Sequence, residues 1–518
     1  MIFTVVRIRR ETNYLFISIY LVVFIGLFVA FFPKFAPIFT GVPSNKTSHG
    51  QHPVSIVINS LSFTYPDGLD ENHNPYLTYI EEQTGLNIDV YMPPVTSYED
   101  TLHTLISSDT NLPDMLSIYS KVRLSTYVQQ NKLMPLEDWI EKYGPDLKRV
   151  IPQEAWDQVT FDGHIYAIPS SYLVNGNELM YVRQDWLDKL KLPRPVTLND
   201  YKRVIKAFTT NDPDGNGKHD TYGLSMLAGL QYTSPLFGAF GIQLNQWTER
   251  NGELVFANTL PEMKEALSFF KELYQEKWID PYFPLHTRQT MLANIEHGKI
   301  GLFAGAWYDT RGAIANNIKK DPKARWVSLD YPVGKNGKQG VEGSRLVHGY
   351  QVITRGSDHS ADVIRLLNFI AGKGRETLIL GFEHQVWTRK NGEIITNFKE
   401  HDKHLYRGIY SSLVNVHDPK LQKMRLDSYG KHYQLYDNIQ RVEKHAVRDL
   451  FWGPSTPTMQ KKWNALNEMQ YDFINIIVGV EPIESFDAYV GRWRMYGGSQ
   501  ITKEVNAWYK TVPQRVQQ

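Results

Sequence analysis

A short polar segment, NDPDGNGKHDTYG (Asn211–Gly223), concentrates side-chain oxygens at alternate positions around two glycines. A helix–loop–helix calcium site takes oxygen ligands at loop positions 1, 3, 5 and 9, a backbone carbonyl at position 7 and a glycine at position 6. Counted from Asp212, positions 3, 5, 6, 7 and 9 hold Asp214, Asn216, Gly217, Lys218 and Asp220. The spacing therefore predicts a calcium ion held by Asp212, Asp214, Asn216, Lys218, Asp220 and Thr221.

The loop departs from the standard pattern at position 12, where Gly223 stands in place of the usual bidentate glutamate. Asp220, Thr221 or a water molecule must then complete the ligand shell. Magnesium fits less well, because it requires a rigid octahedron and keeps several of its waters. A polar turn without an ion is the alternative interpretation. Since the loop follows a predicted helix, VTLNDYKRVIKAF, we expect a structural role for the Ca²⁺ ion.

The composition of the whole chain excludes several classes of function. Its 518 residues are 42% hydrophobic, which is enough for more than one core. The 56 basic and 55 acidic residues give a net charge of +1, and no dense basic run follows the first ten residues, so nucleic acid is not expected as a partner. The chain has no cysteine, which excludes disulfides, thiolate metal sites, cysteine catalysis and a lipid-modified cysteine.

The N-terminus has the pattern of a membrane anchor. Three arginines, Arg7, Arg9 and Arg10, precede the uncharged segment Leu15–Phe32. Its 18 residues approach the length of about 20 that a helix needs to cross a bilayer. The preceding basic residues predict that the N-terminus lies inside and the bulk of the chain outside the cell. We predict a retained signal-anchor, or transmembrane helix, over residues 1–32 and a linker over residues 33–52; a cleaved signal peptide is the alternative.

The remaining chain alternates strands and helices. Ser55–Asn59 and Asp114–Tyr119 have the apolar pattern of buried strands, and Asn74–Gly85 between them has the pattern of a helix. This alternation indicates an α/β fold with parallel strand pairing. The last 60 or so residues have helical patterns. The part beyond the linker is too long for one comfortable core, so two lobes are expected.

Several segments in order resemble family 1 extracellular solute-binding proteins, the substrate-capturing components of ABC importers in the maltose-binding-protein superfamily. They include PDMLSIYSKVRLSTYVQQNKLMPLEDWI, WDQVTFDGHIYAIPSSY and HGKIGLFAGAWYD. The segment WGPSTPTMQKKWNALNEM resembles the tail of Gram-positive oligosaccharide-binding lipoproteins, and the calcium loop resembles that of bacterial alginate-binding proteins. The ordered resemblance covers nearly all of residues 53–510. One departure is the absence of the lipidated cysteine, for which the N-terminal helix can substitute as an anchor.

This resemblance implies a periplasmic-binding-protein-like type II fold, with two α/β lobes joined by a hinge and the ligand between them. It implies crossings near Val174–Leu179, near Gly343–Tyr350 and between about Gln385 and Gly453. The implied domains are an N-lobe of residues 53–177 and 346–450 and a C-lobe of residues 178–345 and 451–518.

Trp307 is the strongest candidate for a ligand contact. Glycine and alanine before it let the backbone approach a cleft, and an indole face can stack on the C–H face of a sugar. Tyr119 and Lys121 follow a predicted strand, where open α/β sheets bind ligands. Packing in a core is the alternative for each residue. The predicted ligand-binding set is Trp307, Tyr119, Lys121, Tyr172, Asn175, Arg345 and Trp387.

We predict an extracellular, membrane-anchored, monomeric binding protein that captures an oligosaccharide, uronic or otherwise derived from plant polysaccharide, and delivers it to an ABC permease. No G-x-S-x-G, H-E-x-x-H, G-x-x-x-x-G-K-[ST] or strand–helix G-x-G-x-x-G motif indicates an enzyme. The alternatives are a membrane-anchored sugar sensor and a polysaccharide-degrading enzyme, whose paired carboxylates would be near in space rather than in sequence.

Overall fold

The computed structural model describes residues 52–108, 110 and 112–512. The predicted N-terminal helix over residues 1–32, and all but the last residue of the linker, lie outside this part of the chain. Among the residues that the structure describes, no helix is both long and apolar enough to cross a membrane.

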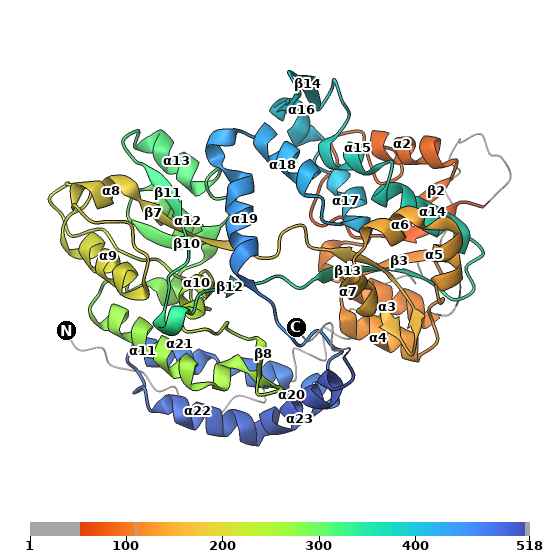
Figure 1. The fold of residues 1–518 in the computed structure, drawn as a ribbon. Helices are drawn as coiled ribbons and strands as arrows, with labels where there is room; N and C mark the ends of the chain where they lie inside the picture. Colours follow the sequence, from red (N-terminus) through yellow and green to blue (C-terminus); the bar gives the residue numbers. More distant parts are fainter. Residues whose placement is uncertain (1–51, 109, 111, 513–518) are drawn as a thin grey trace, which may run out of the picture. The chain divides into compact units, whose positions relative to one another are not determined.

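The first lobe is built on a five-stranded sheet with the order β2-β1-β3-β13-β6. Strand β1 is parallel to β2 and β3, as the alternation predicts, whereas β13 is antiparallel to β3 and β6. All four residues of β3 are buried, as expected of a central strand with helices on both faces (Figure 1). The strands are β1 (Val54–Val57), β2 (Ile88–Tyr91), β3 (Met115–Ile118), β6 (Ile168–Ser171) and β13 (Val347–Ile353).

The helices of this lobe begin and end at residues suited to those places. In α2 the side chain of Asn74 accepts hydrogen bonds from the backbone N–H groups of Tyr76 and Leu77, and Gly85 ends the helix with a left-handed φ of 71°. The lobe's helices are α2 (Pro75–Thr84), α3 (Tyr98–Ser108), α4 (Lys121–Gln129), α5 (Glu137–Tyr143), α6 (Pro145–Val150), α7 (Gln153–Asp157), α14 (Ser360–Ala371), α15 (Arg375–Leu380) and α17 (Arg407–Ser411).

The second lobe has a three-stranded antiparallel sheet with the order β10-β7-β11. Its strands are β7 (Glu178–Arg183), β10 (Leu302–Ala306) and β11 (Trp326–Leu329). Every residue of β7 is buried. The surrounding helices are α8 (Gln184–Lys189), α9 (Leu198–Thr210), α10 (Ser234–Gly238), α11 (Pro261–Gln275), α12 (Arg288–Glu296) and α13 (Ala313–Lys320). The predicted C-terminal helices pack on the same core as α20 (Pro457–Glu468), α21 (Tyr471–Ile477), α22 (Ser485–Trp493) and α23 (Ser499–Tyr509).

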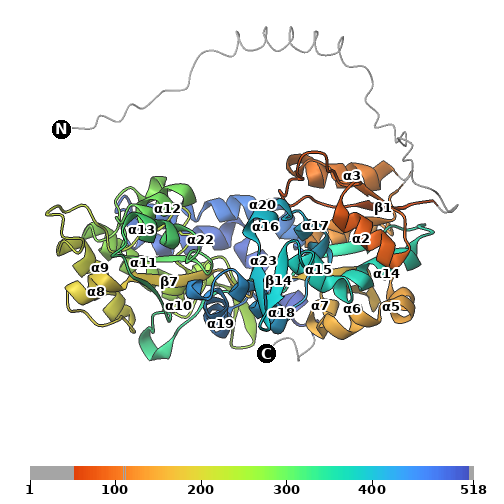
Figure 2. The same ribbon diagram turned by 90° about the horizontal axis from the view of Figure 1, so that it is seen from above.

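Smaller elements complete the two lobes, which lie side by side in both views (Figures 1 and 2). Three hairpins are β4–β5 (Thr160–Phe161 and His164–Ile165), β8–β9 (Trp247–Arg250 and Glu253–Phe256) and β14–β15 (Trp387–Lys390 and Glu393–Thr396). Helices α16 (Phe398–Lys403), α18 (Pro419–Ser428) and α19 (Leu435–His445) follow the last hairpin.

Two large hydrophobic cores define the lobes and correct one predicted boundary. The first core takes its buried side chains from residues 54–168 and 347–416, and the second from residues 179–341 and 442–512. The predicted N-lobe ends at residue 450. This boundary lies too far along the chain, because Val442 is buried in the second core. Ile439, one turn earlier, packs in a small cluster with Trp307 and Val174. Helix α19 therefore belongs beside the second lobe.

Three backbone segments run side by side where the chain passes between the lobes. Gly176 and Gly343 form an antiparallel bridge, and the N–H of Ser344 donates to the carbonyl of Asn175 at 2.7 Å. Strand β12 (Val341–Glu342) pairs in parallel with β16 (Ala446–Val447). The approach is so close that a Cβ on Gly176 would lie 2.8 Å from the carbonyl oxygen of Glu342. We call these three crossing segments the hinge; glycine permits their close contact.

Replacing Gly176 by alanine is expected to destabilise the protein by about 1–3 kcal/mol, because the new methyl group would collide with backbone that cannot move aside. Urea unfolding measures this loss. The matched control is Gly491→Ala in α22, where a Cβ would meet nothing within 4 Å and the helix should gain about 0.5–1 kcal/mol. Equal stability of Gly176→Ala and the parent protein would contradict the steric account of the hinge.

Candidate functional site

The predicted calcium loop is wrapped around the carboxylate of Asp212. One oxygen of Asp212 accepts from the N–H groups of Gly215 and Asn216 at 3.0 and 3.1 Å, and the other accepts from Gly217 at 3.0 Å. Gly215 and Gly217 have φ angles of 75° and 74°, in the left-handed region that glycine adopts without strain. The two glycines thus allow the backbone to turn its N–H groups toward the first acidic side chain.

Three of the predicted ligand side chains meet in this loop. The Asn216 amide donates to Asp214 at 2.8 Å and to Asp220 at 3.0 Å. Asp220 also accepts from the ammonium group of Lys299. Burial, the contact with Asp212 and the nearby charge of Asp220 together raise the pKa of Asp214. The loop therefore gathers negative charge that a cation would stabilise.

Thr221 does not join this cluster. Its hydroxyl donates to the carbonyl of Phe208 in α9 at 2.9 Å, and its side chain is buried. Its predicted role as a metal ligand is corrected, because the side chain points back to the preceding helix. Lys218 contributes an N–H that donates to the side-chain oxygen of Asn216 at 2.7 Å. Over the described residues, no three Asp, Glu or His side chains stand ready-made for a metal ion.

Two of the predicted tyrosines lie together on the sheet of the first lobe. Tyr119 follows β3 and Tyr172 follows β6, and both rings flank His348 of the intervening strand β13. The His348 ring lies 6.4 Å from that of Tyr119, in a stacked arrangement, and 4.6 Å from that of Tyr172. Burial lowers the pKa of His348, which favours the neutral ring. No motif marked His348, because its place depends on the long-range pairing of β13.

Lys121 lies elsewhere, between the first lobe and the C-terminal segment. Its ammonium group donates to the carbonyl of Gln158 and lies 5.5 Å from the ring of Phe161 and 5.3 Å from that of Trp452. Burial lowers the pKa of Lys121 to about 7. This cation–π arrangement ties two parts of the fold together.

The two remaining polar candidates lie at the hinge. The side-chain oxygen of Asn175 accepts from the guanidinium of Arg448 at 2.7 Å, next to the pairing of β12 with β16. Arg345 is exposed two residues beyond Gly343. The structure thus gives Asn175 a partner within the hinge and leaves the Arg345 side chain at the surface.

The two candidate tryptophans have different surroundings. Trp307 follows β10, its N–H donates to the carbonyl of Asn177 at 2.9 Å, and its indole is half-buried at the edge of the second core. Trp387 is only 4% exposed, and its indole N–H donates to the carbonyl of Gly381 at 2.8 Å. Its predicted role as a ligand contact is corrected, because the ring fills the small core of the β14–β15 hairpin and offers no free face.

Two adjoining cavities, of about 450 and 470 Å³, open beside the hinge on the side of the second lobe. Both are lined by Glu178, Gln231 and Glu342. The first cavity extends to α20 and α21, and the second extends to Arg288 of α12 and Ser344 of the hinge. Sequence reasoning missed these cavities, because their walls come from segments far apart in the chain and no local motif marks them.

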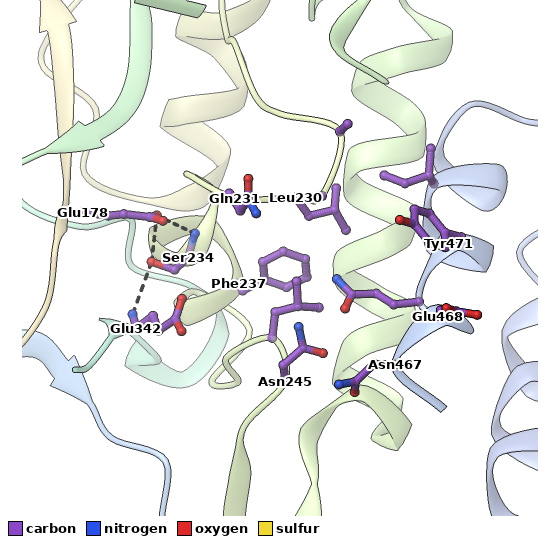
Figure 3. Close-up of a pocket in the computed structure, with 15 residues that line it drawn as sticks. Glu178, Leu230, Gln231, Ser234, Phe237, Asn245, Glu342, Asn467, Glu468 and Tyr471 are labelled. Atoms are coloured by element: carbon purple, nitrogen blue, oxygen red, sulfur yellow. Dashed lines mark hydrogen bonds between the residues drawn. The ribbon is translucent and has the colours of Figure 1, made fainter. Parts of the chain in front are cut away.

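A buried glutamate at the start of β7 organises the shared wall. The Glu178 carboxylate accepts from the N–H of Tyr232 at 2.9 Å, and from the N–H and hydroxyl of Ser234 at 3.0 and 2.8 Å. The Ser234 hydroxyl in turn accepts from the N–H of Glu342 at 3.2 Å (Figure 3). Burial, with a smaller contribution from the nearby Glu342, raises the pKa of Glu178 to about 7. This network joins Tyr232 and Ser234 to strands β7 and β12.

Because the pKa of Glu178 is raised, the stability of the protein is expected to depend on pH. A proton binds Glu178 more tightly in the folded protein than in the unfolded chain, where the pKa is near 4.5, so the stabilisation is present at low pH and is lost as the pH rises through 7. Between pH 5 and pH 8 the parent protein should lose about 2–3 kcal/mol of unfolding free energy relative to Glu178→Gln, whose amide does not titrate. Urea unfolding at both values measures the difference. Parallel pH profiles would contradict a buried, titrating Glu178.

Comparison with known proteins assigns the chain to a family. The family model described as bacterial extracellular solute-binding protein matches residues 76–375. Lipoprotein LipO of Bacillus subtilis is 26% identical over 491 residues, covering 90% of this chain and 94% of that protein. The polygalacturonan/rhamnogalacturonan-binding protein YtcQ of the same species is 24% identical over 446 residues, covering 83% and 87% of the two chains.

Solved structures share the fold. A solute-binding protein associated with an HMO-binding ABC transporter of Bifidobacterium longum infantis superposes with a TM-score of 0.70 at 17% identity, over 89% of this chain and 99% of that one. An EF-hand mutant of the substrate-binding protein FusA of Streptococcus pneumoniae, in complex with fructo-nystose, has a TM-score of 0.65 at 20% identity over the same shares. The predicted α/β, periplasmic-binding-protein-like fold is confirmed. The chain belongs to the family of bacterial extracellular solute-binding proteins.

Proposed function

We propose that this protein captures an oligosaccharide between its two lobes and delivers it to the permease of an ABC importer. The observation that carries the proposal is the pair of adjoining cavities beside the hinge, since each has a volume typical of small-molecule sites. Relatives and structural neighbours described as binding polygalacturonan or fructo-nystose support a carbohydrate ligand.

The lining groups suit a sugar. Gln231, Asn177 and Ser344 supply amide and hydroxyl groups that hydrogen-bond to sugar hydroxyls. The ring of Tyr232 lies 4.6 Å from the guanidinium of Arg288, so this wall joins an aromatic face to a hydrogen-bond donor. Because the cavities adjoin the hinge strands, a sugar that binds the closed arrangement more tightly than the open one would drive closure of the lobes.

We place the folded part outside the cell, anchored to the membrane through the N-terminal segment, and propose that it binds sugar without converting it. The test is a thermal-shift screen of the full chain with neutral and uronic oligosaccharides, followed by chromatography of the recovered sugar. A raised melting temperature with unchanged sugar is the expected result, because a ligand bound only by the native state stabilises it. No response to any sugar overturns carbohydrate binding, and degraded sugar indicates an enzyme.

We also propose that the loop after α9 holds a structural Ca²⁺ ion. The residues fit the ion: Asp212, Asp214 and Asp220 carry hard carboxylate oxygens, and Asn216 brings two of these side chains together. The ion would take the place that the Asn216 amide and the Lys299 ammonium hold beside these carboxylates. Its charge would offset the mutual repulsion that raises the pKa of Asp214. The neighbouring FusA EF-hand variant supports such a site.

Asp214→Ala should abolish the part of the melting temperature that depends on calcium, because it removes one of the clustered carboxylates. Differential scanning fluorimetry in millimolar Ca²⁺ and in chelator gives the two melting temperatures. Asp67→Ala, which removes an exposed carboxylate of the first lobe, is the control and should keep the calcium response. Identical melting of the parent protein in Ca²⁺ and in chelator would show that the loop holds no structural ion.

Trp307→Ala should weaken binding of the sugar found in the screen by more than about 1 kcal/mol, as the loss of an aromatic anchor does. The ring is half-buried at the edge of the second core, and the backbone N–H of Trp307 bonds to Asn177, which lines the second cavity. Isothermal titration calorimetry measures the change. Trp307→Phe keeps an aromatic face and should retain most of the affinity; an unchanged affinity in Trp307→Ala would assign the ring to packing alone.

A further inference from the structure

The cavity that reaches α20 and α21 has an unusual charge balance. Fifteen residues line it, and none of them is lysine, arginine or histidine. Seven carry acid or amide side chains: Glu178, Glu342, Glu468, Gln231, Asn245, Asn467 and Gln470. The amide groups both donate and accept hydrogen bonds, whereas an ionised carboxylate only accepts them. The polar lining is thus matched to a hydroxyl-bearing ligand without negative charge.

Among the residues that the structure describes, no cation offsets the three glutamates that line this cavity. Within the described part of the chain, no basic side chain forms an ion pair with Glu178, Glu342 or Glu468 (the nearest donors to Glu178 are backbone N–H groups and a hydroxyl). Burial raises the pKa of both Glu178 and Glu342, because the ionised carboxylates lose water and gain no cation in return. A second anion brought among them would find no positive partner.

The arginine that lines the adjoining cavity already faces a carboxylate of the protein. The guanidinium of Arg288 donates to Asp309 at 3.1 Å, and the ring of His286 lies 3.3 Å from the carboxylate of Asp280. The Nη1 atom of Arg288 has no hydrogen-bond partner among the described residues, but a ligand carboxylate bound there would share the guanidinium with Asp309. The neighbouring cavity therefore does not reverse the acidic character of the first one.

The rest of the wall is apolar and suits the C–H faces of a sugar. Figure 3 shows Glu178, Ser234 and Glu342 on one side of the cavity and Asn467, Glu468 and Tyr471 on the other, with Phe237 between them. Leu230, Leu244 and Ile474 complete the apolar lining. The Tyr471 ring is 70% exposed, so it offers a free face for stacking.

We propose that this cavity binds an uncharged sugar residue of the oligosaccharide and rejects a uronic acid residue. This preference for uncharged sugar residues rests on the proposed capture of an oligosaccharide. It narrows the substrate class of the protein to neutral oligosaccharides. Hydroxyl groups would bond to the amides and glutamates while the C–H faces pack on Tyr471 and Phe237. A uronate carboxylate at the same place would lose its water beside Glu342 and Glu468, with no cation in the lining to receive it, and this cost disfavours the acidic sugar.

The test is isothermal titration calorimetry of the full chain with neutral and acidic trisaccharides. The neutral probes are kestose, maltotriose and galactotriose; the acidic probes are trigalacturonate and trimannuronate. At least one neutral trisaccharide should bind at least tenfold more tightly than either acidic one. If an acidic trisaccharide binds as tightly as the best neutral one, the selection is wrong while the oligosaccharide proposal stands. If no trisaccharide binds, both proposals fall.

Two charge-reversal variants, one inside the cavity and one outside it, test whether the preference for neutral sugars arises in this cavity. Glu468→Lys, at the exposed end of α20, places a cation in the cavity and should improve the affinity for trigalacturonate at least fivefold while weakening that of the neutral trisaccharide. Glu276→Lys, at the end of α11, makes the same change of charge on the same lobe away from the cavity and should leave both affinities within twofold. Equal effects of the two variants, or no effect of either, would overturn the assignment.

Discussion

The close approach of three backbones at the hinge is the constraint on which the functional architecture depends. Gly176 and Gly343 lie opposite each other, and a side chain on either would collide with neighbouring backbone. Strand β7 begins two residues after Gly176, and β12 ends at the residue before Gly343. Because Glu178 and Glu342 lie within two residues of these glycines, the hinge also places both carboxylates in the wall of the two cavities. In the proposed function, ligand binding and closure of the lobes would therefore involve the same residues.

The Glu178 network shows how such a site holds its shape. A buried carboxylate is costly unless it is hydrogen-bonded, and Glu178 accepts three hydrogen bonds from the loop that covers the cavities. The Ser234 hydroxyl also accepts a hydrogen bond from the backbone of β12. A ligand that displaces this loop would disturb the backbone of the hinge, and hinge movement would alter the wall that the ligand contacts. This reciprocity is the physical basis for coupling between capture and closure.

The C-terminal helices contribute to the site from far along the chain. Helices α20 to α23 share the core of the second lobe, and α20 and α21 provide the far wall of one cavity. The same region brings Trp452 to Lys121 of the first lobe, so the C-terminal segment contacts both lobes. If this cavity binds the sugar as proposed, residues near the end of the sequence would help to decide its specificity.

The sequence by itself determined the local features: the alternation of strands and helices, the capped helices, the turn around Asp212 and the ordered motifs of a solute-binding protein. These depend on hydrophobic period, capping and turn chemistry within a few residues. Only the tertiary structure decided that α19 lies with the second lobe, that Trp387 is buried, that Thr221 turns back to α9 and that His348 lies between Tyr119 and Tyr172. The cavities, too, are visible only in the tertiary structure. Burial, strand register and the contacts between distant segments are set by long-range packing, which no local sequence pattern encodes.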